Sequence, residues 1–506
     1  MSMVRWPSFK LRRGWSRSHA ALFAVVLCLG AGCAAPLRDT PRVKHVVLIV
    51  VDDLGWRDVD WGAHMPAEPL LATPAVASLA AEGLVFTDGY ASAPVCTPTR
   101  TSLMTGASPA RNHITYWTLH SGRDTSREHP SLRPPAWNTE GLQPGDVTLA
   151  GLMSDAGFRT IHVGKAHLGA MGTDGSEPRN LGFDVNVAGH GAGAPASYLG
   201  SEDFSRGQVW DVPGLDRWHG QDVFLTEALT TEAVEHVEAA VRDDESFFLH
   251  FAPYAVHTPI MANPAHIERF ADRDEREAAY ASMVASVDAA VGDLLSTLDR
   301  LGIADETLVV FTSDNGGLSA LARGGTAHVH NAPLRSGKGS GYEGGVRVPW
   351  IVRWPGVTQP GSVSSVPVVT HDLFPTVLAA AGVDLPADHA LDGADMSPAF
   401  TGRDEPFARA LLWHQPHQWG ASGPGIQPYS ALRHGSLKII WWHGSGAYEL
   451  YDVVADPGET DDLASLRPND LAAMRDRLAA GLLAHDAQPS RDRESGAELQ
   501  PPPVRR

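Results

Sequence analysis

One segment of the sequence places a potential nucleophile at a predicted helix N-terminus. Cys96-Thr97-Pro98-Thr99-Arg100 opens a run that we predict to be a short helix ending at Gly106, with Pro98 in its first turn. Free backbone N–H groups and a partial positive charge at such an end favour an anionic substrate beside Cys96. The plainer interpretation, a buried cysteine beside a proline turn, fits this pentapeptide equally well.

Short apolar runs predict the strands that must position this segment. His45 to Val51 is continuous and β-branched, as in a strand buried on both faces of a parallel sheet. Similar runs follow at 160–163, 247–251, 308–312 and 350–352. Helical spacing recurs between them, at 225–241 and 275–301. The alternation predicts an α/β fold with a large doubly wound, mostly parallel sheet flanked by helices.

Polar side chains follow the predicted strands at their carboxyl ends. They are Asp52, Asp53, Lys165, His167, His257, Asp314 and Asn315. In doubly wound sheets, ligands bind beyond the carboxyl ends of the strands, where the loops converge. We therefore expect these residues to lie near one another and near a ligand.

The texture of the sequence changes past Arg403. Short Trp- and His-rich segments with turn residues precede a helical stretch at 463–483, which predicts a smaller antiparallel sheet with a terminal helix. We divide the body into a catalytic domain at 40–402 and a C-terminal α+β domain at 403–486. The charged, Pro-rich tail at 487–506 is predicted to be disordered. Tryptophans of the C-terminal domain, such as Trp419, could stack on sugar rings, although core packing is the commoner use.

Composition excludes several classes of protein. Of 506 residues, 43% are hydrophobic and 20% are charged, which excludes disordered, collagen-like and coiled-coil chains. The formal charge is −19, and no Lys/Arg-rich run stands inside the body, so we expect no nucleic-acid partner.

The N-terminus has the pattern of an export signal. Residues 1–33 carry basic residues, no acidic one and an apolar run at 20–32, which is too short for an ordinary membrane span. The run ends at Cys33 and resembles a bacterial lipoprotein signal, although Leu29 stands four residues before the cysteine rather than three. We expect a periplasmic protein or an outer-membrane protein anchored by a lipid at Cys33, otherwise a secreted one. No membrane span is expected in the mature chain.

The segment at Cys96 resembles the signature of the formylglycine-dependent (type I) sulfatases, which are arylsulfatase-like members of the alkaline phosphatase superfamily. That signature is Cys-X-Pro-Ser/Thr-Arg followed by Leu-X-Thr-Gly. Here it reads CTPTRTSLMTG, with Thr99 where serine is commoner. Further similar motifs are VVDDLGW at 50–56, GKAHLG at 164–169, AVHTP at 255–259, FTSDNGG at 311–317 and PLRSGKGSGYEGGVRVP at 333–349. With DLFPT at 372–376 and ELYDVVADPGET from Glu449, the resemblance covers about residues 44–466.

The resemblance implies a modified nucleophile. A formylglycine-generating maturation enzyme would oxidise Cys96, and the hydrated aldehyde would present two hydroxyls on one carbon. One hydroxyl captures the sulfuryl group, and the second lets the carbon collapse to the aldehyde and expel sulfate. This chemistry implies hydrolysis of a sulfate monoester, and export favours a sulfated carbohydrate as the substrate.

The resemblance also implies a metal site. Asp52, Asp53, Asp314 and Asn315, with the modified residue 96, would hold a hard divalent cation, most readily calcium. Each acidic pair alone could equally be a cap at the end of a strand.

The remaining roles are carried over from the same motifs. Arg100 would hold the formylglycine hydroxyls, and Lys165 and Lys338 would neutralise sulfate oxygens. His167 would hydrogen-bond the hydroxyl involved in aldehyde collapse, and His257 would protonate the departing alcohol oxygen.

Two alternatives remain open from the sequence. The same scaffold also serves phosphonate monoester and phosphodiester hydrolases, whose substrates differ in charge and ester type. A surface protein that binds glycans without turnover is a second alternative. The loops at 117–145, 172–219 and 317–331 meet the alcohol part of the substrate in this family, and the sequence does not show what they select.

Overall fold

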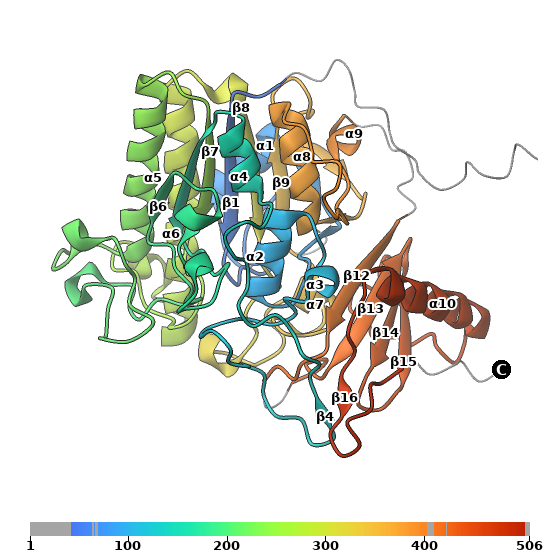
Figure 1. The fold of residues 1–506 in the computed structure, drawn as a ribbon. Coiled ribbons are helices and arrows are strands. Elements are labelled where there is room, and N and C mark those ends of the chain that lie inside the picture. Colours follow the sequence, from blue (N-terminus) through green and yellow to red (C-terminus); the bar gives the residue numbers. More distant parts are fainter. Residues whose placement is uncertain (1–41, 63–64, 66–68, 402–408, 421–422, 501–506) are drawn as a thin grey trace, which may run out of the picture. The chain divides into compact units, whose positions relative to one another are not determined.

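The computed structural model describes residues 42–62, 65, 69–401, 409–420 and 423–500 (Figure 1). All of them belong to one unit of the chain, which begins at Pro41. The predicted signal peptide at 1–33 and the possible lipid anchor at Cys33 lie outside the described residues.

An eight-stranded sheet forms the centre of this unit, in the order β10-β2-β9-β8-β1-β7-β5-β6. Its strands are β1 (His45–Val51), β2 (Leu84–Phe86), β5 (Arg159–Gly164), β6 (Val185–Val187), β7 (Phe247–Ala252), β8 (Thr307–Ser313), β9 (Trp350–Arg353) and β10 (Ser362–Ser364). β1 runs parallel to both β7 and β8. The predicted strand at 350–352 is β9, which runs antiparallel to β8 and β2. The prediction of a mostly parallel sheet is confirmed.

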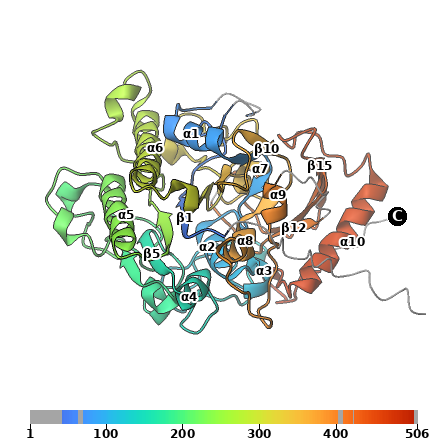
Figure 2. The ribbon, with the colours of Figure 1, turned by 90° about the horizontal axis from the view of Figure 1, so that it is seen from above.

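Helices cover both faces of the sheet (Figure 2). β1 shows why, because its side chains alternate between two cores: Val47, Ile49 and Val51 enter one, and Val46, Leu48 and Val50 enter the other. The first core is closed by α1 (Pro74–Glu82), α5 (Leu225–Arg242) and α6 (Glu275–Arg300). The second is closed by α2 (Cys96–Thr105), α4 (Leu149–Asp155) and α8 (Leu373–Ala381). Shorter elements are β3 (Gly89–Tyr90), β11 (Val368–Val369), α3 (Pro109–Asn112), α7 (Glu343–Val346) and α9 (Ser397–Phe400).

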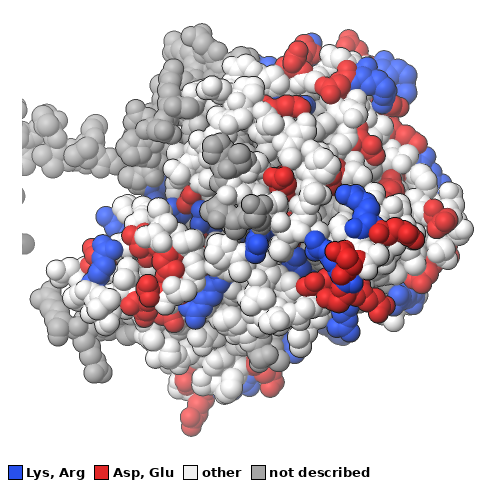
Figure 3. All heavy atoms as spheres, turned by 180° about the vertical axis from the view of Figure 1, so that it is seen from behind, with Lys and Arg blue, Asp and Glu red and all other residues white. Residues whose placement is uncertain are grey.

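Helix α6 has the length and composition of a membrane span, and 83% of its most apolar 18-residue window is buried inside the protein. That burial is typical of a core helix. Figure 3 shows a face on which acidic and basic side chains are interspersed. Ion pairs such as Arg300–Glu238 join neighbouring exposed side chains of this kind.

A four-stranded antiparallel sheet follows, as predicted, from β12 (Ala410–Gln415) through β13 (Tyr429–His434) and β14 (Leu437–Trp442) to β15 (Tyr448–Asp452). Helix α10 (Pro468–Ala484) packs on one face of it through Met474, Leu478 and Leu482. The other face packs against the larger part of the unit, where Trp413 and Trp442 meet Tyr90 and Tyr342.

Buried charges reinforce this contact between the two sheets. Lys438 Nζ on β14 lies 2.9 Å from Glu343 Oε1 and 3.0 Å from Glu459 Oε1. Arg433 on β13 lies 2.5 Å from Asp88. Such pairs are costly to break singly, because the remaining charge would stay buried without a counterion.

The tail differs from its prediction. Residues 487–500 are not disordered: β16 (Arg491–Asp492) pairs with β4 (Leu132–Arg133), and Ser490 is buried. Its hydroxyl lies 2.8 Å from His443 Nδ1 and donates to Pro416 O. Composition gave the wrong expectation because a few buried polar contacts hold this segment, and composition does not report on them. Residues 501–506 lie outside the described residues.

Candidate active site

The strand register places two acidic pairs side by side. Val51 of β1 stands opposite Ser313 of β8, so the residues that follow them leave the sheet together. Asp53 N donates to Asp314 Oδ1 at 3.2 Å, and Asn315 Nδ2 donates to Asp53 Oδ1 at 2.9 Å. The predicted convergence of polar residues at the carboxyl ends is present in the structure.

Cys96 is the first residue of α2, as the sequence predicted, and it is a free, buried thiol. The helix ends at Gly106, whose φ of 68° gives it a left-handed cap. Thr99 fixes the turn that leads into the helix, because its Oγ1 accepts from Ala93 N at 3.0 Å. A threonine hydroxyl therefore serves at this position, where serine is commoner in the signature.

Arg100 connects the nucleophile segment to two strands. Its Nε donates to Asp314 Oδ2 at 2.8 Å and its Nη1 donates to Lys165 O at 2.8 Å. Its Nη2 is buried and has no hydrogen-bond partner among the described residues. Burial alone would lower the pKa of Arg100, but Asp314 and Asp52 raise it, so the guanidinium is charged. An unpaired donor of this kind is available to a group at position 96.

The two lysines lie against carboxylates. Lys165 Nζ is 2.7 Å from Asp52 Oδ2, and Lys338 Nζ is 2.5 Å from Asp53 Oδ1. Burial raises the pKa of Asp52 well above its usual value, and Lys165 only partly offsets this. For Asp53, burial is outweighed by Lys338 and His257, and the pKa falls below the usual range. Both lysines thus occupy positions from which they can neutralise an anion.

The residues fit a hard cation. Asp52 Oδ1 and Asn315 Oδ1 are buried and accept no hydrogen bond from the described residues. Ligand atoms of Asp52, Asp53 and His257 all lie within 4.8 Å of one another. Oxygen dominates the donor set, which suits calcium better than a thiolate-seeking metal. The sequence placed His257 near these carboxylates but did not count it as a ligand, and the structure brings its ring within reach of the same site.

One ring nitrogen of His167 forms a hydrogen bond and the other does not. Nε2 donates to Thr118 O at 2.7 Å, whereas Nδ1 is buried and has no partner among the described residues. Burial, together with Lys165, holds the pKa of His167 well below its usual value, so Nδ1 carries a lone pair. The ring fits because residue 193 is glycine; a Cβ there would collide with it. Nδ1 can therefore accept a proton from a hydroxyl nearby.

His257 is oriented by the residue that follows it. Its Nδ1 lies 2.8 Å from Thr258 O and donates to that carbonyl, which leaves Nε2 3.8 Å from Asp53 Oδ2. Burial first, and then Lys338, lower the pKa of His257 to about 3. Nε2 is the atom through which this ring can exchange a proton with a substrate.

A cavity of about 220 Å³ joins these groups to the surface. Cys96, His167, His257, Asp53 and Lys338 line it. So do three half-buried tryptophans, Trp117, Trp210 and Trp419, from three separate loops. The sequence indicated the loops that hold Trp117 and Trp210, and it indicated Trp419 itself. It did not predict that the three rings line one cavity, because no spacing rule connects residues so far apart in the chain.

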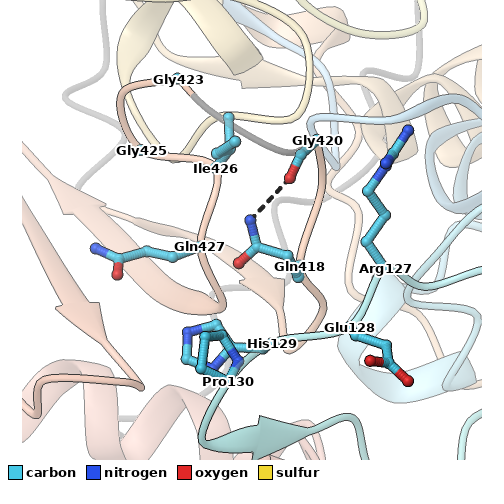
Figure 4. Close-up of a pocket in the computed structure, with 10 residues that line it drawn as sticks. All are labelled: Arg127, Glu128, His129, Pro130, Gln418, Gly420, Gly423, Gly425, Ile426 and Gln427. Atoms are coloured by element: carbon cyan, nitrogen blue, oxygen red, sulfur yellow. Dashed lines mark hydrogen bonds between the residues drawn. The ribbon is translucent and has the colours of Figure 1, made fainter.

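Two further hollows adjoin this cavity. One of about 390 Å³ shares Leu318, Lys338 and Trp419 with it. The other, of about 720 Å³, shares Gly420 and Ile426 with the 390 Å³ hollow and is lined in part by polar side chains (Figure 4). Its lining includes Arg127, Glu128, Gln418 and Gln427, and Gln418 Nε2 donates to Gly420 O at 3.0 Å.

Comparison with known proteins identifies the family. Residues 44–383 match the family model described as Sulfatase, and residues 337–486 match that described as N-sulphoglucosamine sulphohydrolase, C-terminal. The chain is 32% identical to N-acetylgalactosamine-6-sulfatase of Mus musculus, over 84% of this chain and 85% of that protein. It is 30% identical to arylsulfatase A of Homo sapiens, over 89% of each. The crystal structure of Ps i-CgsB in complex with k-i-k-neocarrahexaose superposes with a TM-score of 0.72 at 28% identity, covering 87% of this chain and 93% of that one. The chain therefore belongs to the type I sulfatases of the alkaline phosphatase superfamily, and its activity is that of a sulfuric ester hydrolase.

Proposed function

We propose that this sulfatase hydrolyses sulfate monoesters of a carbohydrate, after export, with a formylglycine at position 96 and a bound calcium ion. The observation that carries the proposal is a set of buried polar atoms around Cys96 without partners among the described residues. They are Asp52 Oδ1, Arg100 Nη2, His167 Nδ1 and Asn315 Oδ1. Buried polar atoms are normally paired, and the gathering of these four around Cys96 supports groups that bind there.

Named residues would hold each of these two groups. Asp52, Asp53, Asp314 and Asn315 would hold the calcium ion, which supplies positive charge for the sulfate oxygens. The hydrated formylglycine would supply the nucleophilic hydroxyl and a second hydroxyl for product release.

The chain's own residues then divide the work. Arg100 Nη2 donates to the group at position 96 and orients it. Lys338 lines the cavity beside Cys96 and forms an ion pair with Asp53. When the substrate binds, the ammonium group of this lysine pairs with the incoming sulfate instead. Lys165, fully buried, compensates Asp52. His167 Nδ1 accepts the proton that a hydroxyl releases.

His257 serves the leaving group. Its Nδ1 is committed to Thr258 O, so a proton for the departing alcohol must come from Nε2. An anionic ester beside Nε2 raises the pKa of the ring from its low value and favours the protonated form.

A carbohydrate substrate is supported by the relatives. N-acetylgalactosamine-6-sulfatases are among the proteins that this chain matches at 32% identity. Ps i-CgsB, at 28% identity, was solved with a neocarrahexaose. The signal pattern at residues 1–33, with Cys33 as a possible lipid anchor, supports a location outside the cytoplasm.

The test is sulfate release from sulfated glycans by protein co-expressed with a formylglycine-generating enzyme. We expect release from at least one sulfated glycan and loss of release in Cys96→Ala. A faster rate on aryl phosphodiesters than on aryl sulfates would overturn the substrate assignment. Glycan binding without turnover, after complete conversion of Cys96, would instead support a non-catalytic protein.

A further inference from the structure

We propose that the leaving-group side of the active site selects an uncharged ring, with Trp419 as its main contact. This inference rests on the proposed function, because it concerns the alcohol part of the sulfate ester. It starts from Trp117, Trp210 and Trp419, which line the cavity above Cys96.

Trp419 is held in place by contacts with Tyr116, Lys338 and Gly339. Its ring makes an edge contact with Tyr116 at 5.9 Å and lies 5.6 Å from Lys338 Nζ. Gly339 has a φ of +84°, and a Cβ there would collide with the Trp419 indole. The glycine after Lys338 therefore lets the indole approach the backbone beside the sulfate-binding lysine.

The C-terminal sheet positions Trp419. Trp419 lies between β12 and β13, and Tyr116 Oη donates to Gln418 O at 3.0 Å. His417 stacks on Tyr116 with ring centroids 4.7 Å apart, and both its nitrogens lie within 2.8 Å of hydroxyls of Thr115 and Ser126. The buried neighbours fix Trp419 while its own ring remains half-buried and lines two hollows.

Charge is scarce on this side of the site. Of the described residues that line the 220 Å³ cavity and the 390 Å³ hollow beside it, Lys338 is the only Lys or Arg. Its charge is committed to Asp53 and to the scissile sulfate. The second hollow continues with Leu318, Ala320, Leu321 and Ala322. Three histidines also line these spaces, His167 and His257 in the cavity and His328 in the hollow. A carboxylate or second sulfate on the same ring would lose water there and gain no lysine or arginine partner, which is unfavourable.

Arg, Glu and Gln side chains line the hollow that lies farther out. Arg127, Glu128, Gln418 and Gln427 surround the 720 Å³ hollow, which meets the second one at Gly420 and Ile426 (Figure 4). In that view the side chains of Arg127 and Glu128 extend in different directions. The ring that carries the scissile sulfate thus lies against aromatic and aliphatic side chains, as sugar and aryl faces do on tryptophan.

The test measures binding separately from turnover. In the Cys96→Ala background, quenching of tryptophan fluorescence gives the Kd of 4-methylumbelliferyl sulfate and of its 3-carboxymethyl derivative, which adds a carboxylate to the ring. We expect the probe with the uncharged ring to bind about twentyfold more tightly, the size of effect that an unpaired charge produces. Trp419→Ala should weaken binding of that probe about tenfold, and Trp419→Phe should restore most of it.

Trp218→Ala is the matched control, because Trp218 is also half-buried and donates to Glu232 away from these hollows. Should Trp419→Ala fail to fold, Ala320→Lys replaces it and is expected to improve binding of the carboxylated probe selectively. Equal affinity for the two probes, or a Kd unchanged by Trp419→Ala, would overturn the inference. Selective binding in a matured wild-type protein that releases no sulfate would support the inference and contradict the proposed function.

Discussion

Lys338 Nζ lies 2.5 Å from Asp53 Oδ1, and this pair completes a balance of buried charges. Asp52, Asp53 and Asp314 face Lys165, Lys338 and Arg100 across the carboxyl ends of β1 and β8. Burial raises the pKa of Asp52, and a bound cation favours its ionised form, in which three negative and three positive charges cancel. A divalent cation held by the carboxylates therefore leaves the site with excess positive charge, which matches an anionic ester.

Calcium should stabilise the protein through this site. Adding calcium to protein treated with a chelator should raise the free energy of unfolding by about 2.7 kcal/mol at a hundredfold excess over Kd. We expect to see this as a higher midpoint of thermal unfolding. Asn315→Leu removes an unpaired oxygen and should abolish most of the shift. Asp288→Asn changes a buried carboxylate that accepts from Ala75 N and Val76 N, so its shift should remain. An equal shift in all three proteins would place calcium elsewhere.

His257→Ala should harm poorly activated leaving groups most. A good leaving group departs without a proton, whereas an alkoxide needs one from Nε2. We expect a loss of about 10²–10³-fold for sugar sulfates and under tenfold for nitrophenyl sulfate, measured as kcat/KM over a series of leaving-group pKa values. The control is Thr231→Val, an exposed position on α5 whose hydroxyl donates to Glu227 O. A loss of the same size across the series would contradict the role.

Glu459 should make stability depend on pH. Burial, partly offset by Lys438 and reinforced by Glu343, raises the pKa of Glu459 to about 7. Because the folded-state pKa exceeds the unfolded one, the favourable contribution is complete below the unfolded pKa of about 4.5 and disappears as pH rises through 7. The unfolding free energy of wild type relative to Glu459→Gln should therefore fall between pH 5 and 8, as denaturant titrations can show.

The exposed carboxylate of Glu238, paired with Arg300, gives the control for this measurement. Glu238→Gln should track wild type across the same pH range. A constant difference between wild type and Glu459→Gln would mean that Glu459 does not titrate there.

Ser490 should contribute to stability although it lies in the tail. Its removal leaves His443 Nδ1 buried without its hydroxyl partner, and we expect Ser490→Ala to cost about 1–3 kcal/mol. Ser495→Ala, at an exposed position that bonds within its own turn, should cost less than about 0.5 kcal/mol. Chemical denaturation of both variants tests the comparison, and equal stabilities would show that the tail is not anchored through Ser490.

Sequence patterns predicted what local rules govern. The apolar run at His45–Val51, the helical spacing of α5 and α6 and the position of Asp52 and Asp314 after their strands follow from periodicity and sheet geometry. β9 runs antiparallel although its apolar run resembles the parallel strands, because strand direction depends on the connection rather than on the run itself.

The remaining features depend on contacts between distant residues. Trp117, Trp210 and Trp419 line one cavity only in the folded chain, and Ser490 is buried where its hydroxyl contacts His443, the residue after β14. The pairing of Lys338 with Asp53 likewise joins residues far apart in the sequence. Residue types alone indicate a sulfatase, while the surroundings of its leaving group require the tertiary structure.

Conversion of Cys96 is the central claim, and peptide mass spectrometry tests it most directly. Cys96 is buried at the start of α2, so Cys96→Ala should fold, at a cost of about 1 kcal/mol, and lose all turnover. In protein from a host with a formylglycine-generating enzyme, the peptide spanning Cys96 should be lighter by about 18 Da than the cysteine form, with sulfatase rate proportional to the converted fraction. An unmodified thiol in protein that turns over sulfate esters would contradict the account.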